Sequence, residues 1–111
     1  TRVFDLHCTI GEPFLAIMGG QGDVAAATDR LITPDLQHGQ LVDAAESGAV
    51  VSMLVHAQTL TSLNTGLGLQ AFREAMRRFR ARYGRRLVWH KPTDLIRVHS
   101  ADYERQQPLT L

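Results

Sequence analysis

The sequence has little cysteine and no long apolar run, and each of these shortages excludes a class of protein. Its single cysteine, Cys8, cannot form an internal disulfide and cannot build a thiolate metal cage alone. No stretch approaches the roughly 20 consecutive apolar residues that span a bilayer. The first five residues lack the basic start and apolar core of a signal peptide. We therefore expect no membrane role, and the compartment stays open.

Strong charge, low complexity and internal repeats are also missing. The 12 basic and 11 acidic residues nearly cancel, and the 44% of hydrophobic residues are spread along the chain, so a folded domain is indicated. A chain of 111 residues can bury a modest core but cannot close an eight-stranded barrel of about 250 residues. Because it begins with Thr1 and not Met, we expect residues 1–111 to be a single domain or a fragment.

Three short segments predict β-strands. Residues 2–10 alternate in part and end at Gly11-Glu12-Pro13, a turn signal. Residues 49–55 are nearly all apolar, which is typical of a strand covered on both faces of a parallel sheet. Residues 86–89 predict a third strand, and residues 14–18 fit either a buried strand or one helical turn.

Helices are predicted between these segments. Asp23 can cap a short helix at 24–27, and residues 35–47 form an amphipathic stretch that ends at Gly48. After a polar loop over 58–68, in which Asn64 or Thr65 can cap the next helix, residues 69–83 predict the strongest element. Its apolar stripe, which we expect to be core, is Leu69, Phe72, Met76, Phe79 and Tyr83.

A last short helix is predicted to open at Pro92-Thr93-Asp94 and to carry Leu95, Ile96 and Val98. The order from residue 35 is then helix, strand, helix, strand, helix. The predicted fold class is α/β, with alternating strands and helices.

His56 is the first candidate for chemistry because it directly follows the predicted strand 49–55. The carboxyl ends of parallel strands form the rim at which ligands bind in α/β proteins. Histidine has an ordinary pKa of about 6.5, which suits proton exchange near neutral pH. The position therefore indicates a general acid or base, and a plain hydrogen bond to a neighbouring loop is the alternative.

The run LVDAAESGAVVSMLVH over residues 41–56 resembles the last part of the polysaccharide deacetylase superfamily of carbohydrate esterases. Leu54-Val55-His56 matches the Leu-x-His motif of that superfamily. Residues 69–83 match its long helix, and residues 84–89 with 93–96 match its closing strand and helix. The resemblance covers about residues 34–100.

The resemblance implies the C-terminal portion of a (β/α) barrel-like fold and metal-dependent removal of acyl groups from a carbohydrate substrate. His56 would be the catalytic acid that protonates the leaving amine or alcohol, and Leu54 would help to line the pocket for the acyl methyl group. The Asp-Asp and His-x-x-x-His motifs that hold the divalent metal of the parent enzyme have no counterpart here. We therefore assign no metal ligand and expect this chain alone to be inactive.

Other reactive residues give weaker indications. His7 lies in Asp5-Leu6-His7-Cys8, which is similar to the strand-end Asp-x-His of metal-dependent amidohydrolases, but Thr9 stands where a second histidine belongs. A metal site would need His7, His56, His38 or His90 to converge. Cys8 as a nucleophile would need a nearby base, so we expect a buried structural cysteine.

The glycine-rich run 19–22 lacks the Lys-Ser/Thr of a phosphate-binding loop, and we expect a flexible connection there.

Charge is distributed unevenly along the chain. Residues 1–64 carry two basic and seven acidic residues, a net charge of −5, whereas residues 65–111 carry ten basic and four acidic residues, a net charge of +6. The alternative function is therefore a small stand-alone α/β binding or assembly domain. Its Arg-rich helix, with Arg73, Arg77, Arg78, Arg80 and Arg82, would contact an anionic partner.

An outward, solvated face with some ion pairs is the simpler interpretation of these arginines. The net charge is only +1 and there is no aromatic stacking platform, so we expect no nucleic acid partner. In a fragment, part of the apolar stripe would lie uncovered and drive self-association.

Overall fold

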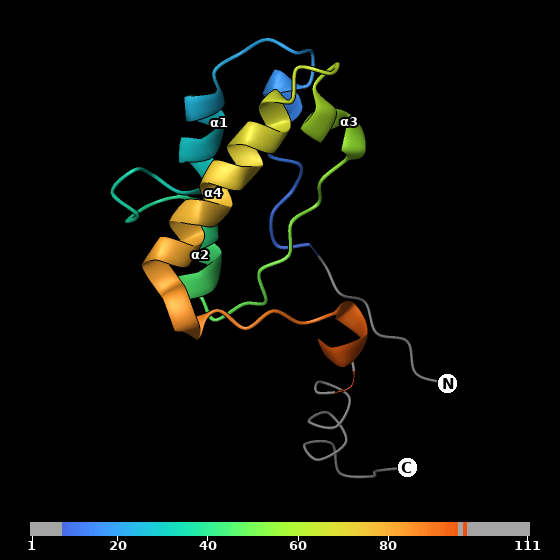
Figure 1. Ribbon diagram of the computed structural model, residues 1–111. Coiled ribbons are helices and arrows are strands. Elements are labelled where there is room, and N and C mark those ends of the chain that lie inside the picture. Colours follow the sequence, from blue (N-terminus) through green and yellow to red (C-terminus); the bar gives the residue numbers. More distant parts are fainter. Residues whose placement is uncertain (1–7, 96, 98–111) are drawn as a thin grey trace, which may run out of the picture. The chain divides into compact units, whose positions relative to one another are not determined.

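The computed structural model describes residues 8–95 and residue 97, and it is mainly helical (Figure 1). The order of elements is η1 (Leu15–Ile17), α1 (Val24–Leu31), α2 (Gln40–Glu46), α3 (Ala57–Thr61), α4 (Leu67–Tyr83) and η2 (Gly84–Arg86). All of them belong to a compact unit that contains residues 8–86, and residues 87–95 and 97 belong to a second unit. No helix among the described residues is long and apolar enough to cross a bilayer.

The predicted α/β class and the barrel-like fold are wrong for the part of the chain that the structure describes. Its only β pairing is one isolated parallel bridge between Ile10 and Met53, and it contains no sheet. Residues 49–55 have the composition of a buried strand, but a sheet requires partner strands, and only the short segment around Ile10 pairs with them. Of the predicted strand 2–10, residues 2–7 lie outside the described residues.

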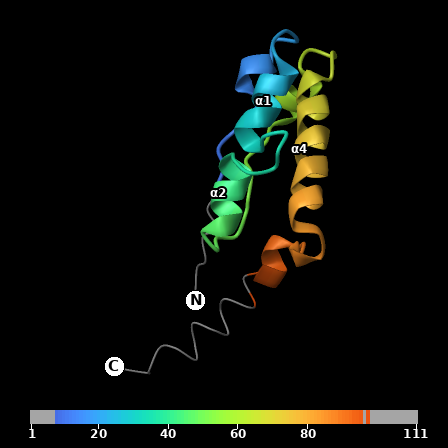
Figure 2. The same cartoon turned by 90° about the vertical axis from the view of Figure 1, so that its left-hand side faces the viewer.

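α1 begins at Val24, as the sequence predicts, and is longer than the predicted helix 24–27. The side chain of Asp23 accepts a hydrogen bond from the backbone N–H of Ala26 at 3.1 Å, which confirms the predicted cap. The helix continues past residue 27 to Leu31 and buries Ala27, Thr28 and Leu31. Figures 1 and 2 show α1 lying beside α4, against which it packs.

α4 buries a different stripe from the one that its large side chains predict. Its buried residues are Gly68, Ala71, Ala75, Phe79 and Tyr83. Leu69 is 38% exposed, and Phe72 and Met76 are half-buried. The predicted stripe is therefore correct only in its second half, because the first half of α4 approaches its neighbours through residues with small side chains or none.

The turn between α3 and α4 caps the long helix in an unpredicted way. A helix, α3, forms at the start of the predicted loop 58–68, and neither Asn64 nor Thr65 is the N-cap of α4. The residue at the N-cap position is Gly66, which makes no side-chain hydrogen bond. The hydroxyl of Ser62 instead accepts from the N–H of Gly68 at 2.9 Å and donates to the carbonyl of Thr59 at 2.7 Å.

α2 is shorter than the predicted helix 35–47 because its first residues form a turn. The carboxylate of Asp35 accepts hydrogen bonds from the hydroxyl of Thr33 at 2.6 Å and from the backbone N–H of Gln37 at 3.1 Å. Local side-chain bonds of this kind compete with helix formation. Leu36 has a φ of 67°, so the helix starts only at Gln40.

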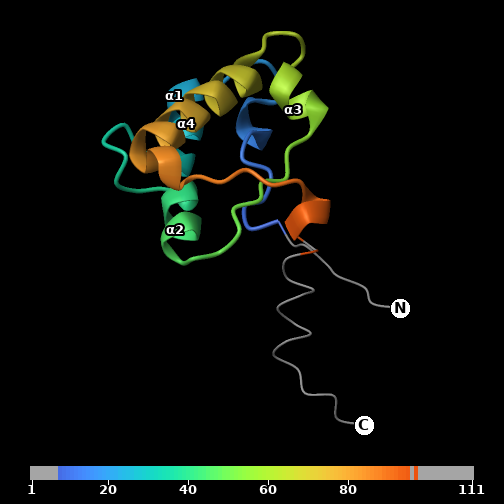
Figure 3. The same ribbon diagram turned by 60° about the horizontal axis from the view of Figure 1, so that its bottom comes forward.

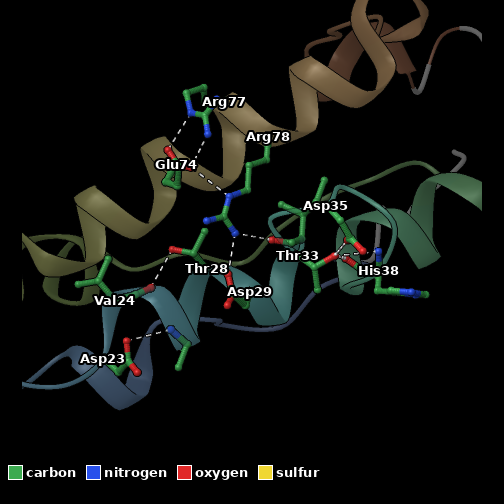
Figure 4. Close-up of polar contacts among 12 residues, drawn as sticks. Asp23, Val24, Thr28, Asp29, Thr33, Asp35, His38, Glu74, Arg77 and Arg78 are labelled. Atoms are coloured by element: carbon green, nitrogen blue, oxygen red, sulfur yellow. Dashed lines mark hydrogen bonds and ion pairs between the residues drawn. The ribbon is translucent and has the colours of Figure 1, made fainter.

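Arg78 joins α4 to α1, as Figure 4 shows. Its guanidinium donates to Asp29 at 2.7 Å, to the carbonyl of Ile32 at 2.9 Å and to Glu74 at 3.0 Å, and its side chain is only 12% exposed. Arg82 reaches in the same way to the carbonyl of Leu36 at 2.7 Å and to Glu46 at 3.3 Å. The outward arginine face is therefore wrong for Arg78 and Arg82, and the acidic first half is their partner.

In the second unit, residues 87–91 are irregular and residues 92–95 are helical. The predicted strand 86–89 is wrong: Arg86 ends η2, and Val88 and Trp89 are 72% and 70% exposed. The last helix begins as predicted at Pro92, whereas Ile96 and Val98 lie outside the described residues.

Gly68→Ala tests the close contact between α3 and α4. A Cβ at this position would overlap the carbonyl of Thr59. We expect a loss of about 3 kcal/mol in the free energy of unfolding, although alanine favours a helix interior by about 1 kcal/mol over glycine. Urea unfolding measures the change. The matched control is Gly19→Ala, which meets no atom within 4 Å, and a stabilised Gly68→Ala variant would contradict the packing.

Arg78→Ala tests the link between α4 and α1, with Arg77→Ala as its matched control. Both side chains pair with Glu74, but Arg77 is 68% exposed and has no partner on α1 among the described residues. Arg78→Ala should destabilise the fold by about 2 kcal/mol, because it leaves Asp29 and a backbone carbonyl without their donor. Arg77→Ala should cost clearly less. Equal losses in urea unfolding would show that Arg78 is not a structural link.

Candidate acid–base site

The candidate site lies directly after two extended segments that run parallel. The carbonyl of Ser52 accepts from the N–H groups of Thr9 and Ile10 at 2.8 and 2.9 Å, and Leu54 donates its N–H to the carbonyl of Ile10 at 3.0 Å. Figure 3 shows these segments side by side. Glu12 and His56 each follow one of them, so the pairing brings both side chains to the same end.

Glu12 holds His56 through its carboxylate. Oε2 accepts from the backbone N–H of His56 at 2.7 Å and lies 2.9 Å from Nδ1 of the His56 ring, and Oε1 accepts from the N–H of Phe14 at 3.0 Å. The side chain of Glu12 is 6% exposed, whereas that of His56 is 52% exposed. The carboxylate is thus enclosed, and the ring it orients reaches solvent.

Two opposing effects act on the pKa of Glu12. Burial raises the pKa, but hydrogen bonds from the His56 ring and from the N–H groups of Phe14 and His56 lower it, with a smaller contribution from the side chain of Thr59. The lowering effects prevail, and the pKa of Glu12 lies below its ordinary value of 4.5. Glu12 is therefore a carboxylate at neutral pH and accepts every hydrogen bond it makes.

The charge of Glu12 decides which nitrogen of His56 carries a proton. A carboxylate only accepts, so Nδ1 must be the donor in the 2.9 Å contact. Nε2 is then the nitrogen left to gain or lose a proton. A histidine oriented by a carboxylate in this way is the usual arrangement for general acid–base catalysis.

Leu54 and His56 share one face of the extended chain. Alternate residues of an extended segment point to the same side, and Leu54 is 46% exposed while Val55 between them is half-buried. The structure thus places the two predicted site residues together. Their roles as substrate-binding residue and catalytic acid stay predictions.

Sequence reasoning missed Glu12, which it used only as part of a turn signal. One indication was available: Glu12 closely follows the predicted strand 2–10, just as His56 follows the predicted strand 49–55. Glu12 and His56 are 44 positions apart in the sequence. The parallel pairing of the two segments brings them together, and this pairing cannot be read from the sequence.

The described residues do not fit a divalent metal. They contain no group of three or more His, Cys, Asp or Glu side chains that could hold one. His38 lies in the exposed turn before α2, where its N–H donates to the hydroxyl of Thr33 at 3.1 Å. His90 belongs to the second unit, and His7 lies outside the described residues. No step is therefore assigned to a metal.

Cys8 differs from what we expect, and the glycine run is in part closely packed. Cys8 is exposed, so the buried structural role is wrong, and its sulfur lies 3.8 Å from the hydroxyl of Ser52. Within the glycine run, a Cβ on Gly20 would lie 2.9 Å from the carbonyl of Ser62, whereas one on Gly19 would meet no atom within 4 Å; the flexible connection stays a prediction. Asp23 occupies the N-terminus of α1 with its own carboxylate, which disfavours a phosphate there.

Comparison of the chain with family models, with curated proteins and with solved structures found no match.

Glu12→Gln tests the state of the buried carboxylate. A folded-state pKa below the ordinary 4.5 means that Glu12 stabilises the fold above pH 4.5 and that this contribution is lost as the pH falls through the folded-state value. The variant should be less stable than the wild type at pH 7, and the difference should shrink as the pH falls below 4.5. Urea unfolding at several pH values measures it. A constant difference would mean that the Glu12 carboxylate is not the stabilising form.

Proposed function

We propose that His56, oriented by Glu12, is the general acid of a hydrolase that removes acyl groups from a carbohydrate. One observation carries the proposal: the enclosed carboxylate of Glu12 lies 2.9 Å from Nδ1 of a ring that is 52% exposed. The resemblance of Leu54-Val55-His56 to the Leu-x-His motif of polysaccharide deacetylases supports the choice of reaction.

One step of the proposed reaction requires a proton donor. When an acyl amide or ester is hydrolysed, the C–N or C–O bond breaks and the leaving amine or alcohol must gain a proton. Nε2 of His56 donates that proton, while Glu12 keeps the ring in place and retains its own negative charge. Leu54, on the same face, offers an apolar contact for a small acyl group.

The proposal assigns only this proton transfer to the described residues. Deacetylases of the resembling superfamily use a divalent metal to polarise the acyl carbonyl and to activate water. The described residues do not supply its ligands. The part of the reaction that needs the metal is therefore outside what these residues do.

The test is acetate release from N- and O-acetylated oligosaccharides by the protein in its full natural length. His56→Ala should lower the turnover number by at least about 10²-fold, the effect expected for loss of a general acid, with the fold unchanged by circular dichroism. Glu12→Gln should lower it less and should shift the pH profile, because the amide still contacts the ring but carries no charge. The matched control is His38→Ala in the exposed turn, which should leave turnover unchanged.

Two results would contradict the proposal. Wild-type turnover in His56→Ala would remove this residue from the reaction. Absence of acetate release from the full natural protein, with or without added divalent metal, would favour the alternative function instead.

That alternative is a binding or assembly domain, and one observation favours it. Four arginines, Arg73, Arg77, Arg80 and Arg85, line an open hollow along α4 together with the half-buried Phe72 and Met76. All four are exposed, unlike Arg78 and Arg82. Exposed guanidinium groups beside apolar side chains suit an anionic partner with an apolar portion.

A further inference from the structure

Thr59, in the first turn of α3, is a buried polar residue beside the candidate site. It is 1% exposed, and its hydroxyl donates to the carbonyl of His56 at 2.7 Å. The same side chain also interacts by a hydrogen bond with Glu12. A hydroxyl has one proton, and the carbonyl and the ionised carboxylate only accept. The hydroxyl of Thr59 can therefore donate to only one of these two neighbours at a time.

The carbonyl of His56 does not depend on this hydroxyl. It also accepts from the backbone N–H groups of Thr59 at 3.1 Å and of Leu60 at 3.2 Å. A carbonyl oxygen has two lone pairs, so these two donors can satisfy it. The hydroxyl of Thr59 can thus turn away from the carbonyl without leaving a buried acceptor unpaired.

The backbone of Thr59 is held in place, so the hydroxyl proton is the part that can move. The fully buried Ser62 donates its hydroxyl to the carbonyl of Thr59 at 2.7 Å. Gly68 packs so closely against the same carbonyl that a Cβ would overlap it. Rotation about one C–O bond redirects the proton and leaves this packing unchanged.

We propose that Thr59 is a positioning residue whose hydroxyl turns from the His56 carbonyl to the Glu12 carboxylate when the His56 ring gives up its proton. The inference rests on the proposed function, in which Nε2 of His56 is the proton donor. In that step the Nε2–H bond breaks, its electron pair stays on the ring, and the proton goes to the leaving amine or alcohol. The ring becomes neutral, and Glu12 loses the positive charge beside it. A buried anion then needs a further donor, which Thr59 supplies.

This response of Thr59 makes His56 a better acid. Before the transfer, the imidazolium balances the charge of Glu12 through a charge-assisted hydrogen bond. After the transfer, the hydroxyl of Thr59 stabilises the carboxylate beside the neutral ring. A donor that acts mainly in the later state lowers the free energy needed to release the proton. Among the described residues, Glu12 is the ionisable side chain that pairs with His56, so the effect of Thr59 on the ring passes through it.

NMR titration of the His56 ring in the full chain tests the proposal without a substrate, with His56→Ala to identify the ring signals. Thr59→Val keeps the branched shape and removes the hydroxyl. The pH midpoint at which the ring gains its proton should rise by roughly 0.5 unit or more, because the neutral-ring state loses a donor. Thr59→Ser keeps a hydroxyl and should keep the wild-type midpoint. The matched control is Thr61→Val on the same helix, whose exposed hydroxyl bonds to the carbonyl of Gln58; its midpoint should not change.

A wild-type midpoint in Thr59→Val, or an equal rise in Thr59→Ser, would overturn the proposal. A purely structural Thr59 would change the free energy of unfolding without this pattern of midpoints. If Thr59→Val does not fold, the wild type decides. The side-chain signals of Thr59 should shift with the same midpoint as the His56 ring, and signals that stay fixed while the ring titrates would overturn the proposal.

Turnover separates this inference from the proposed function. A raised midpoint in Thr59→Val together with wild-type turnover in His56→Ala would contradict the reaction and support the coupling of Thr59 to the pair. Lost turnover in His56→Ala together with an unchanged midpoint in Thr59→Val would support the reaction and overturn the role of Thr59.

Discussion

The close contact of α4 with α1 and α3 is the constraint on which the other features depend. Gly68, Ala71 and Ala75 are buried on α4, and because their side chains are small or absent, the neighbouring backbone comes near the helix axis. At Gly68 the contact leaves no room for a Cβ. Since α3 is held here and His56 is the residue at its N-cap, the packing of α4 also positions the candidate site.

The uneven charge along the chain is used inside the fold. Arg78 and Arg82 of the basic second half reach Asp29 and Glu46 of the acidic first half. Hydrogen bonds from Tyr83 and Arg82 hold the pKa of Glu46 below its ordinary value. Part of the positive charge of α4 is thus neutralised within the chain, and the arginines on its exposed side remain for other contacts.

Glu12 and His56 have different roles in the candidate site: the buried carboxylate orients the ring, and the ring is the half-exposed group. A buried carboxylate is stable only when donors surround it, and Glu12 receives them from His56 and Phe14. The ring of His56 gains a defined orientation in return, and its side chain stays about half exposed, at 52%.

Local interactions decided what the sequence by itself determined: the Asp23 cap of α1, the long helix ending at Tyr83 and the helix start at Pro92. Each depends on side chains a few residues apart, which a linear pattern records. Only the tertiary structure decided that residues 49–55 pair with a single short segment, that α4 buries Gly68 and Ala71 in place of Leu69, and that Glu12 meets His56. These outcomes depend on contacts between distant parts of the chain, where packing and hydrogen-bond partners outweigh local propensity.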